Sequence, residues 1–189
     1  MTTGIMIVGV GGQGTLLASR LIGGAVAAQG LDVKVSEVHG MSQRGGSVVT
    51  YVKYGEHVDS PIIGKGEADF ILAFEELEAA RWLPYLKKGG KIVVNRQNLD
   101  PMPVITGAAV YPLGLIEKMQ DAGIDVKAED ALALAVKAGS SKAVNVVLIG
   151  MFAASGNIPE QVWLDTIKKT VPEKFLEMNL QAFRYGYES

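Results

Sequence analysis

The sequence has 189 residues, of which 48% are hydrophobic, and a formal net charge of −2. This length suits one domain with a substantial core, and the charge argues against a nucleic-acid-binding protein, which would show a basic face. With no cysteine and only two histidines, His39 and His57, the sequence disfavours thiolate-held iron–sulfur clusters, disulfides, a thiol nucleophile and a zinc site.

The hydropathy pattern indicates neither a membrane span nor a signal peptide. The longest apolar run, Val146–Ala154, is interrupted by Gly150 and falls well short of the roughly 18 residues that a span needs. No basic leader precedes the first apolar run, as a signal peptide would require. We therefore expect a cytoplasmic protein that contacts neither membranes nor nucleic acids.

The N-terminal third predicts a strand, a helix and two further strands. Gly4–Val8 is a short buried strand, Thr15–Ala28 has apolar residues at helical spacing, and Asp32–Val38 and Ser47–Gly55 are strands. Only the eight residues His39–Gly46 link the last two, whereas a parallel crossover needs about a dozen or more. We therefore predict that these two strands are antiparallel.

The remainder alternates further strands and helices. We predict strands at Ala68–Phe74, Gly89–Asn95 and Ala108–Leu113, and helices at Glu75–Leu86, Leu115–Ala122, Glu129–Ala138, Val144–Gly156, Pro159–Thr170 and Pro172–Tyr185. This order predicts an α/β, Rossmann-like three-layer fold with residues 1–189 in a single domain. Its sheet is mostly parallel, with one antiparallel strand after the second strand, and helices lie on both faces.

A first glycine-rich motif lies between the first predicted strand and helix. Gly9, Gly11 and Gly14 fit the pattern G-x-G-x-x-G, in which glycines let the backbone approach a phosphate and the helix N-terminus offers free N–H groups. Glu37, at the end of the second strand, could accept a hydrogen bond from a ribose hydroxyl. The missing crossover helix counts against NAD. The alternative is that the glycines only make a tight turn.

A second motif, "HGMSQRGG", follows the second strand. Ser42, Gln43 and Arg44 supply hydrogen-bond donors, and Gly45 and Gly46 allow close backbone approach. The planar guanidinium of Arg44 suits a phosphate or a carboxylate. The alternative is a polar loop whose arginine pairs with a carboxylate of this chain or of a partner.

Other distinctive side chains are interpreted as structural. His39 and His57 are expected in loops or at the surface, and Trp82 and Trp163 in the core or at an interface. Asn145 lies at the start of the most apolar predicted helix, where an N-cap role is expected.

The two motifs together, with "KAVNVVLIGMFAASG" at Lys142–Gly156 and "NLQAFRYG" at Asn179–Gly186, carry a family resemblance. From about residue 4 to residue 186 the sequence resembles the gamma-type subunit or domain of 2-oxoacid:ferredoxin oxidoreductases. The "MSQRGG" form is most similar to the beta subunit of the indolepyruvate-oxidising branch.

This resemblance implies an accessory subunit of a multi-subunit enzyme. The enzyme decarboxylates an aryl pyruvate, passes electrons to ferredoxin and releases an aryl-acetyl-CoA. Thiamine diphosphate and iron–sulfur clusters belong to the companion subunit, so this chain has no catalytic residue, no metal and no activity alone. Residues that would face the phosphates of coenzyme A or the partner are Gly9, Gly11, Gly12, Gln13, Gly14, Thr15, Ser42, Gln43, Arg44, Gly45 and Gly46.

Several alternatives stay open at this point. The substrate could be pyruvate, 2-oxoglutarate or ketoisovalerate rather than an aryl pyruvate. The chain could also be an NAD-binding dehydrogenase or a non-enzymatic nucleotide-binding protein. As a subunit made for a permanent interface, it should expose apolar surface or self-associate when isolated.

Overall fold

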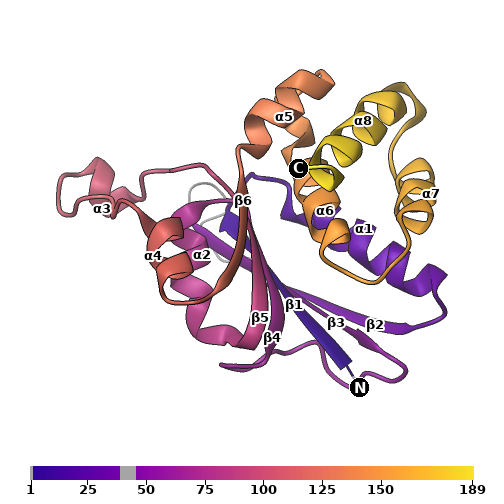
Figure 1. Ribbon diagram of the computed structural model, residues 1–189, viewed down its shortest axis with the longest axis horizontal. Helices are drawn as coiled ribbons and strands as arrows, with labels where there is room; N and C mark the ends of the chain where they lie inside the picture. Colours follow the sequence, from indigo (N-terminus) through magenta and orange to yellow (C-terminus); the bar gives the residue numbers. More distant parts are fainter. Residues whose placement is uncertain (1, 39–45) are drawn as a thin grey trace.

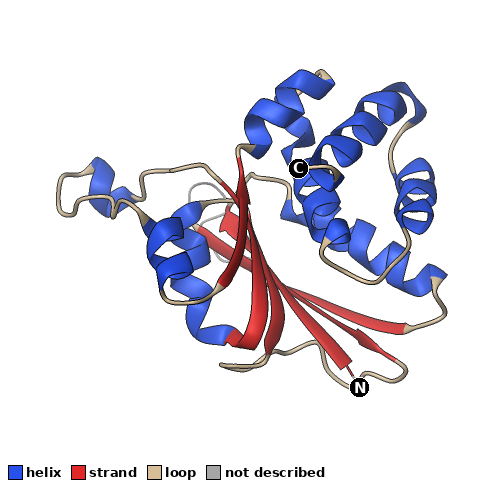
Figure 2. Cartoon of the chain, viewed as in Figure 1, coloured by secondary structure: helices blue, strands red, loops and turns tan. Residues whose placement is uncertain are grey.

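The computed structural model describes residues 2–38 and 46–189. Its six-stranded sheet has the order β2-β3-β1-β4-β5-β6, and helices cover both faces (Figure 1, Figure 2). The strands are β1 (Thr2–Val10), β2 (Asp32–Val38), β3 (Ser47–Gly55), β4 (Ala68–Ala73), β5 (Leu86–Asn95) and β6 (Asp125–Glu129). The predicted Rossmann-like α/β class is confirmed.

Strand β3 runs against its neighbours on both sides. It is antiparallel to β2 and to β1, whereas β1, β4, β5 and β6 pair in parallel. The predicted antiparallel pairing is therefore confirmed, and β3 also separates β1 from β2. Val10 at the end of β1 lies opposite Ser47 at the start of β3, and Val38 at the end of β2 pairs with Val49. The first motif and Gly46, the last residue of the second motif, thus lie at the same end of the strands.

The helices divide between the two faces of the sheet. They are α1 (Thr15–Ala28), α2 (Glu76–Trp82), α3 (Met102–Ile105), α4 (Leu115–Asp121), α5 (Ala131–Ala138), α6 (Val144–Ala154), α7 (Glu160–Thr170) and α8 (Leu176–Tyr187). Helices α2 and α4 lie on one face, and α1 with α5 to α8 on the other (Figure 1). The short α3 lies in a segment that projects from the body of the protein (Figure 1).

Alternate residues of β1 enter two separate cores. Ile5 and Ile7 pack into the larger core beneath α1 and α6, and Met6 and Val8 pack into the smaller core beneath α2 and α4. A strand buried on both faces is apolar at nearly every position, which explains the continuous apolar run of β1. Helix α6 is buried almost all round, so its lack of an amphipathic pattern follows from its position between the sheet, α1 and α8.

One predicted strand is wrong, and one strand of the sheet was not predicted. Residues 108–113 form no strand, and Val110 there is 90% exposed. The sixth strand is instead Asp125–Glu129, which pairs with β5 at the edge of the sheet. An edge strand is only partly buried, so its sequence "DVKAE" lacks the apolar signal of the inner strands. The predicted helix from Glu129 consequently begins later, at Ala131, where the Asp130 side chain accepts a hydrogen bond from the Ala133 N–H.

Candidate functional site

The two glycine-rich motifs are joined by a backbone hydrogen bond at the carboxyl edge of the sheet. The Gly11 N–H donates to the Gly46 carbonyl at 2.9 Å. Gly12 and Gly14 have φ angles of 103° and 86°, which glycine adopts without the strain of a side chain. Sequence reasoning therefore identified two segments that do meet in space. Ser42, Gln43, Arg44 and Gly45 lie outside the described residues, and their ligand role stays a prediction.

Gln13 braces the first loop from within. Its Oε1 accepts from the Val10 N–H at 2.7 Å, and its Nε2 donates to the Phe74 carbonyl at 3.2 Å. A Cβ atom at Gly9 would lie 2.7 Å from Oε1 of Gln13, so Gly9 makes room for this brace. These two residues shape the loop, and their predicted contact with a ligand stays a prediction.

Helix α1 presents its N-terminus directly after this loop. Gly14 is the N-cap and Thr15 the first helical residue, and no side chain in the described ranges caps the helix. No acidic residue lies in its first turn. The free N–H groups and the helix dipole therefore favour an anion here. Glu37, by contrast, accepts a hydrogen bond from the Ser19 hydroxyl on α1 at 3.1 Å.

A pocket of about 430 Å³ opens beside the loop and is here called the loop pocket. The loop residues Gly12 and Gly14 form one side, and Lys142 and Asn145 form another. Among the described residues that line it, Lys142 is the only charged one. Sequence reasoning missed Lys142, because the lysine precedes α6 and no local pattern connects it to a loop more than a hundred residues earlier.

Asn145 contacts the glycine-rich loop, and the N-cap interpretation of this residue is wrong. A 3-10 turn at Ser141–Ala143 leads into α6, which begins at Val144, so Asn145 lies inside the first turn. Its Nδ2 is 3.5 Å from the Gly14 carbonyl oxygen. A Cβ atom at Gly14 would lie only 2.8 Å from Nδ2. Close packing between the loop and α6 therefore requires glycine at position 14.

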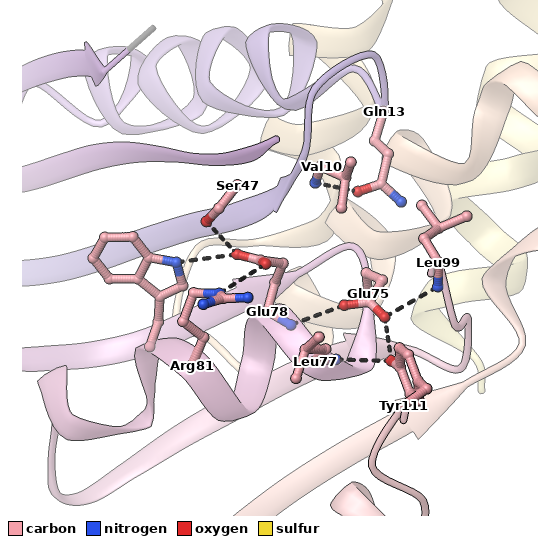
Figure 3. A network of polar contacts seen from close by, with 10 residues as sticks. Val10, Gln13, Ser47, Glu75, Leu77, Glu78, Arg81, Leu99 and Tyr111 are labelled. Atoms are coloured by element: carbon pink, nitrogen blue, oxygen red, sulfur yellow. Dashed lines mark hydrogen bonds and ion pairs between the residues drawn. The ribbon is translucent and has the colours of Figure 1, made fainter. Parts of the chain in front are cut away.

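A second pocket, of about 540 Å³, lies against Gly11 and Gly46 and is here called the acidic pocket. Buried Glu78 lines it and accepts hydrogen bonds from the Ser47 hydroxyl, from Nε1 of Trp82 at 3.3 Å and from Nε of Arg81 at 3.0 Å (Figure 3). The indole of Trp82 packs against the smaller core, as the sequence predicted, and it also donates to Glu78.

Buried Glu75 joins three parts of the chain at this pocket. Its carboxylate caps α2 by accepting from the Glu78 N–H at 2.8 Å, and it also accepts from the Leu99 N–H at 3.2 Å and from the Tyr111 hydroxyl (Figure 3). Burial, followed by the hydrogen bond to Glu75, raises the pKa of Tyr111. Tyr111 therefore stays protonated as a donor. The projecting segment, residues 99–114, is thus held by one carboxylate at Leu99 and again at Tyr111.

The charges of the two pockets select where an anion would bind. The described lining of the acidic pocket carries three carboxylates, Glu75, Glu78 and Asp100, against a single arginine, Arg81. The loop pocket has Lys142 and no carboxylate among its described lining residues. Because like charges repel strongly where water is partly excluded, a phosphate is favoured in the loop pocket.

Two classes of feature are absent from the part of the chain that the structure describes. No group of three or more histidine, aspartate or glutamate side chains gathers as the ligands of a metal ion would. No helix in residues 2–38 and 46–189 is long and apolar enough to cross a membrane.

Comparison with known proteins decides the family. The model of the pyruvate ferredoxin/flavodoxin oxidoreductase family matches residues 4–189. The chain belongs to this family. Within the pyruvate ferredoxin/flavodoxin oxidoreductase family it is similar to the indolepyruvate oxidoreductase subunit IorB of Thermococcus kodakarensis, with 43% identity over 98% of this chain and 94% of the relative. The predicted resemblance is confirmed.

Solved structures show that the fold is shared. The gamma subunit of a keto/oxoacid ferredoxin oxidoreductase from Geobacter sulfurreducens superposes with a TM-score of 0.73 and 23% identity, over 98% of this chain and 96% of that one. The 2-oxoglutarate:ferredoxin oxidoreductase of Magnetococcus marinus, solved with 2-oxoglutarate, coenzyme A and succinyl-CoA bound, gives 0.76 and 20% identity, over 99% of this chain and 30% of that one. The fold of this chain thus also occurs as part of a longer chain.

Proposed function

We propose that the chain is the accessory subunit of an indolepyruvate ferredoxin oxidoreductase. The enzyme oxidatively decarboxylates an aryl pyruvate to an aryl-acetyl-CoA and reduces ferredoxin. The 43% identity to an indolepyruvate oxidoreductase subunit over nearly the whole of both chains supports this substrate class. Rates of the assembled enzyme with indolepyruvate, pyruvate, 2-oxoglutarate and ketoisovalerate test it, and a preference for any of the last three would move the chain to another branch of the family.

The redox groups belong to a companion subunit in this proposal. The sequence has no cysteine, so its residues do not fit an iron–sulfur cluster held by thiolates. In this proposal the companion therefore holds the clusters, and electrons reach ferredoxin through it. We assign thiamine diphosphate to the companion as well. This chain contributes binding and positioning of a substrate at the shared interface.

Coenzyme A is the substrate that the loop pocket fits, through its phosphates. The observation that carries this assignment is the combination of the Gly12–Gly14 turn, the uncapped N-terminus of α1 and Lys142 around one pocket without a described carboxylate. Backbone N–H groups and a lysine point charge are the donors that phosphates accept in many proteins. The Magnetococcus relative, solved with coenzyme A bound, supports the same ligand.

Replacing Lys142 should selectively weaken the binding of coenzyme A. In the assembled enzyme we expect Lys142→Ala to raise the KM for coenzyme A about ten- to a hundredfold, which is the usual effect of losing one charge-assisted hydrogen bond of about 1.5–3 kcal/mol. Reduction of the companion's clusters by the 2-oxoacid without coenzyme A should be unchanged.

The matched control for this experiment is Lys88→Ala. Lys88 is also exposed, but it lies near the amino end of β5, away from the carboxyl edge. Its KM for coenzyme A should equal that of the wild type. An unchanged KM in Lys142→Ala would contradict the assignment of the loop pocket to coenzyme A.

The isolated chain should have no activity of its own. Since the sequence offers no thiolate for a cluster, the purified chain should be colourless and should not reduce a dye with any 2-oxoacid. Addition of the purified companion should restore turnover in proportion to the amount of this chain. Visible iron–sulfur absorbance in the pure chain, or dye reduction by it alone, would overturn the division of roles.

A further inference from the structure

A third pocket, of about 400 Å³, adjoins the loop pocket and is here called the helix pocket. It is lined by residues of α1, of the connection between α5 and α6, and of the segment from the end of α7 into α8. Lys142 and Asn145 line both this pocket and the loop pocket. The two pockets therefore adjoin at these two side chains.

The helix pocket differs in character from the loop pocket. Its walls are mostly apolar, because Leu17, Val171, Pro172, Phe175 and Met178 all line it. Phe175 is 45% exposed although its ring is large and apolar. Such a pocket suits the flat faces of a ring system rather than a charged group.

Besides Asn145, a second buried amide, Asn179, lines this pocket. Asn179 is 6% exposed, and its Nδ2 donates to the Phe175 carbonyl at 2.8 Å. Its Oδ1 accepts no hydrogen bond from the part of the chain that the structure describes. Oδ1 is not among the buried side-chain atoms without a partner, so it keeps contact with solvent. It can therefore accept a hydrogen bond from a ligand in the pocket that Asn179 lines.

We infer that the helix pocket holds the adenine ring of the nucleotide whose phosphates lie in the loop pocket, which rests on the proposed function. Adenine offers two apolar faces to Phe175 and the aliphatic walls, and its exocyclic amino group donates to Oδ1 of Asn179. Hypoxanthine has a carbonyl in place of that amino group, so it would bring a second acceptor to Oδ1. The pocket therefore selects adenine over hypoxanthine.

The test is an NMR titration of the full chain with three separate probes. Adenosine, which has no phosphate, should shift the backbone amides of Val171, Phe175 and Asn179. Inosine should bind about fivefold more weakly, because it cannot donate the hydrogen bond to Oδ1, and one such bond contributes about 1 kcal/mol. Pyrophosphate, which has no ring, should shift the amides of Gly12, Gly14 and neighbouring residues instead.

A variant with a matched control tests the ring contact. Phe175→Ala should lower the affinity for adenosine about tenfold, because the ring loses a stacking partner. The affinity for pyrophosphate should be unchanged. The exposed position of Phe175 makes this change compatible with folding. Val136→Ala on α5, where the side chain is 58% exposed, should change neither.

The outcomes distinguish the ring site inferred here from the phosphate site of the proposed function. Binding of pyrophosphate without adenosine overturns the ring site and leaves the phosphate site of the proposed function standing. Binding of adenosine without pyrophosphate supports the ring site and overturns the phosphate site. Equal affinity for adenosine and inosine overturns the role of Asn179. Shifts in the helix pocket only on addition of the companion would identify a protein-docking surface and overturn the inference.

Discussion

Gly150→Ala should prevent the chain from folding stably. A Cβ atom at position 150 would lie 2.1 Å from the Phe183 carbonyl oxygen and 2.8 Å from the Tyr187 nitrogen, both backbone atoms of α8. Gly186 is its counterpart, since a Cβ atom there would lie 1.9 Å from the Val147 carbonyl oxygen of α6. Side-chain overpacking costs about 1–3 kcal/mol when neighbours can shift. Here whole helices must separate, so we expect more than about 3 kcal/mol.

Urea unfolding followed by circular dichroism measures this effect. Because most domains are stable by only about 5–15 kcal/mol, Gly150→Ala should unfold at a much lower urea concentration or accumulate as insoluble protein. Gly23→Ala in α1 is the matched control, since a Cβ there meets nothing within 4 Å, and it should stabilise the chain by about 0.5–1 kcal/mol. Wild-type unfolding of Gly150→Ala would show that α6 and α8 do not pack this closely.

Glu75→Ala should release the projecting segment from the body of the protein. The change leaves the Glu78 and Leu99 N–H groups and the Tyr111 hydroxyl without their common acceptor. Each buried donor left unpaired costs about 1–3 kcal/mol, so we expect a total loss of about 3–5 kcal/mol with some relaxation. Glu75→Gln should cost less, because it keeps one carbonyl oxygen as an acceptor.

Hydrogen exchange and limited proteolysis follow the release directly. Amides of residues 99–114 should exchange faster in Glu75→Ala, and cleavage there should precede cleavage elsewhere. Glu76→Ala is the matched control on the same helix, because no described N–H or hydroxyl of residues 99–114 donates to its carboxylate, whereas Leu99 and Tyr111 donate to Glu75. Equal protection of residues 99–114 in Glu75→Ala and in the wild type would contradict the role of Glu75.

The projecting segment also exposes several large apolar side chains. Met102, Ile105, Val110 and Leu113 are large apolar side chains that are 63–90% exposed, in line with the apolar surface expected of a subunit. Self-association of the isolated chain stays a prediction, which analytical ultracentrifugation can check.

Local patterns in the sequence were sufficient for much of the fold and part of the site. The bounds of α1, β2 and β3 agree with the structure, because the apolar periodicity of each is complete within its own residues. The eight-residue link 39–46 by itself excluded a parallel crossover. The glycine spacing indicated a loop that a phosphate can approach, and this loop does lie against Gly46 of the second motif.

Only the tertiary structure decided how distant segments complete the site. The insertion of β3 between β1 and β2, the edge position of β6 and the approach of Asn145 to Gly14 depend on pairings far apart in the chain. Lys142 lines the loop pocket, and Tyr111 meets Glu75, for the same reason. The hydrophobic periodicity of a segment indicates whether that segment forms a helix or a strand. Which distant residue contacts a buried charge depends instead on how the whole chain packs.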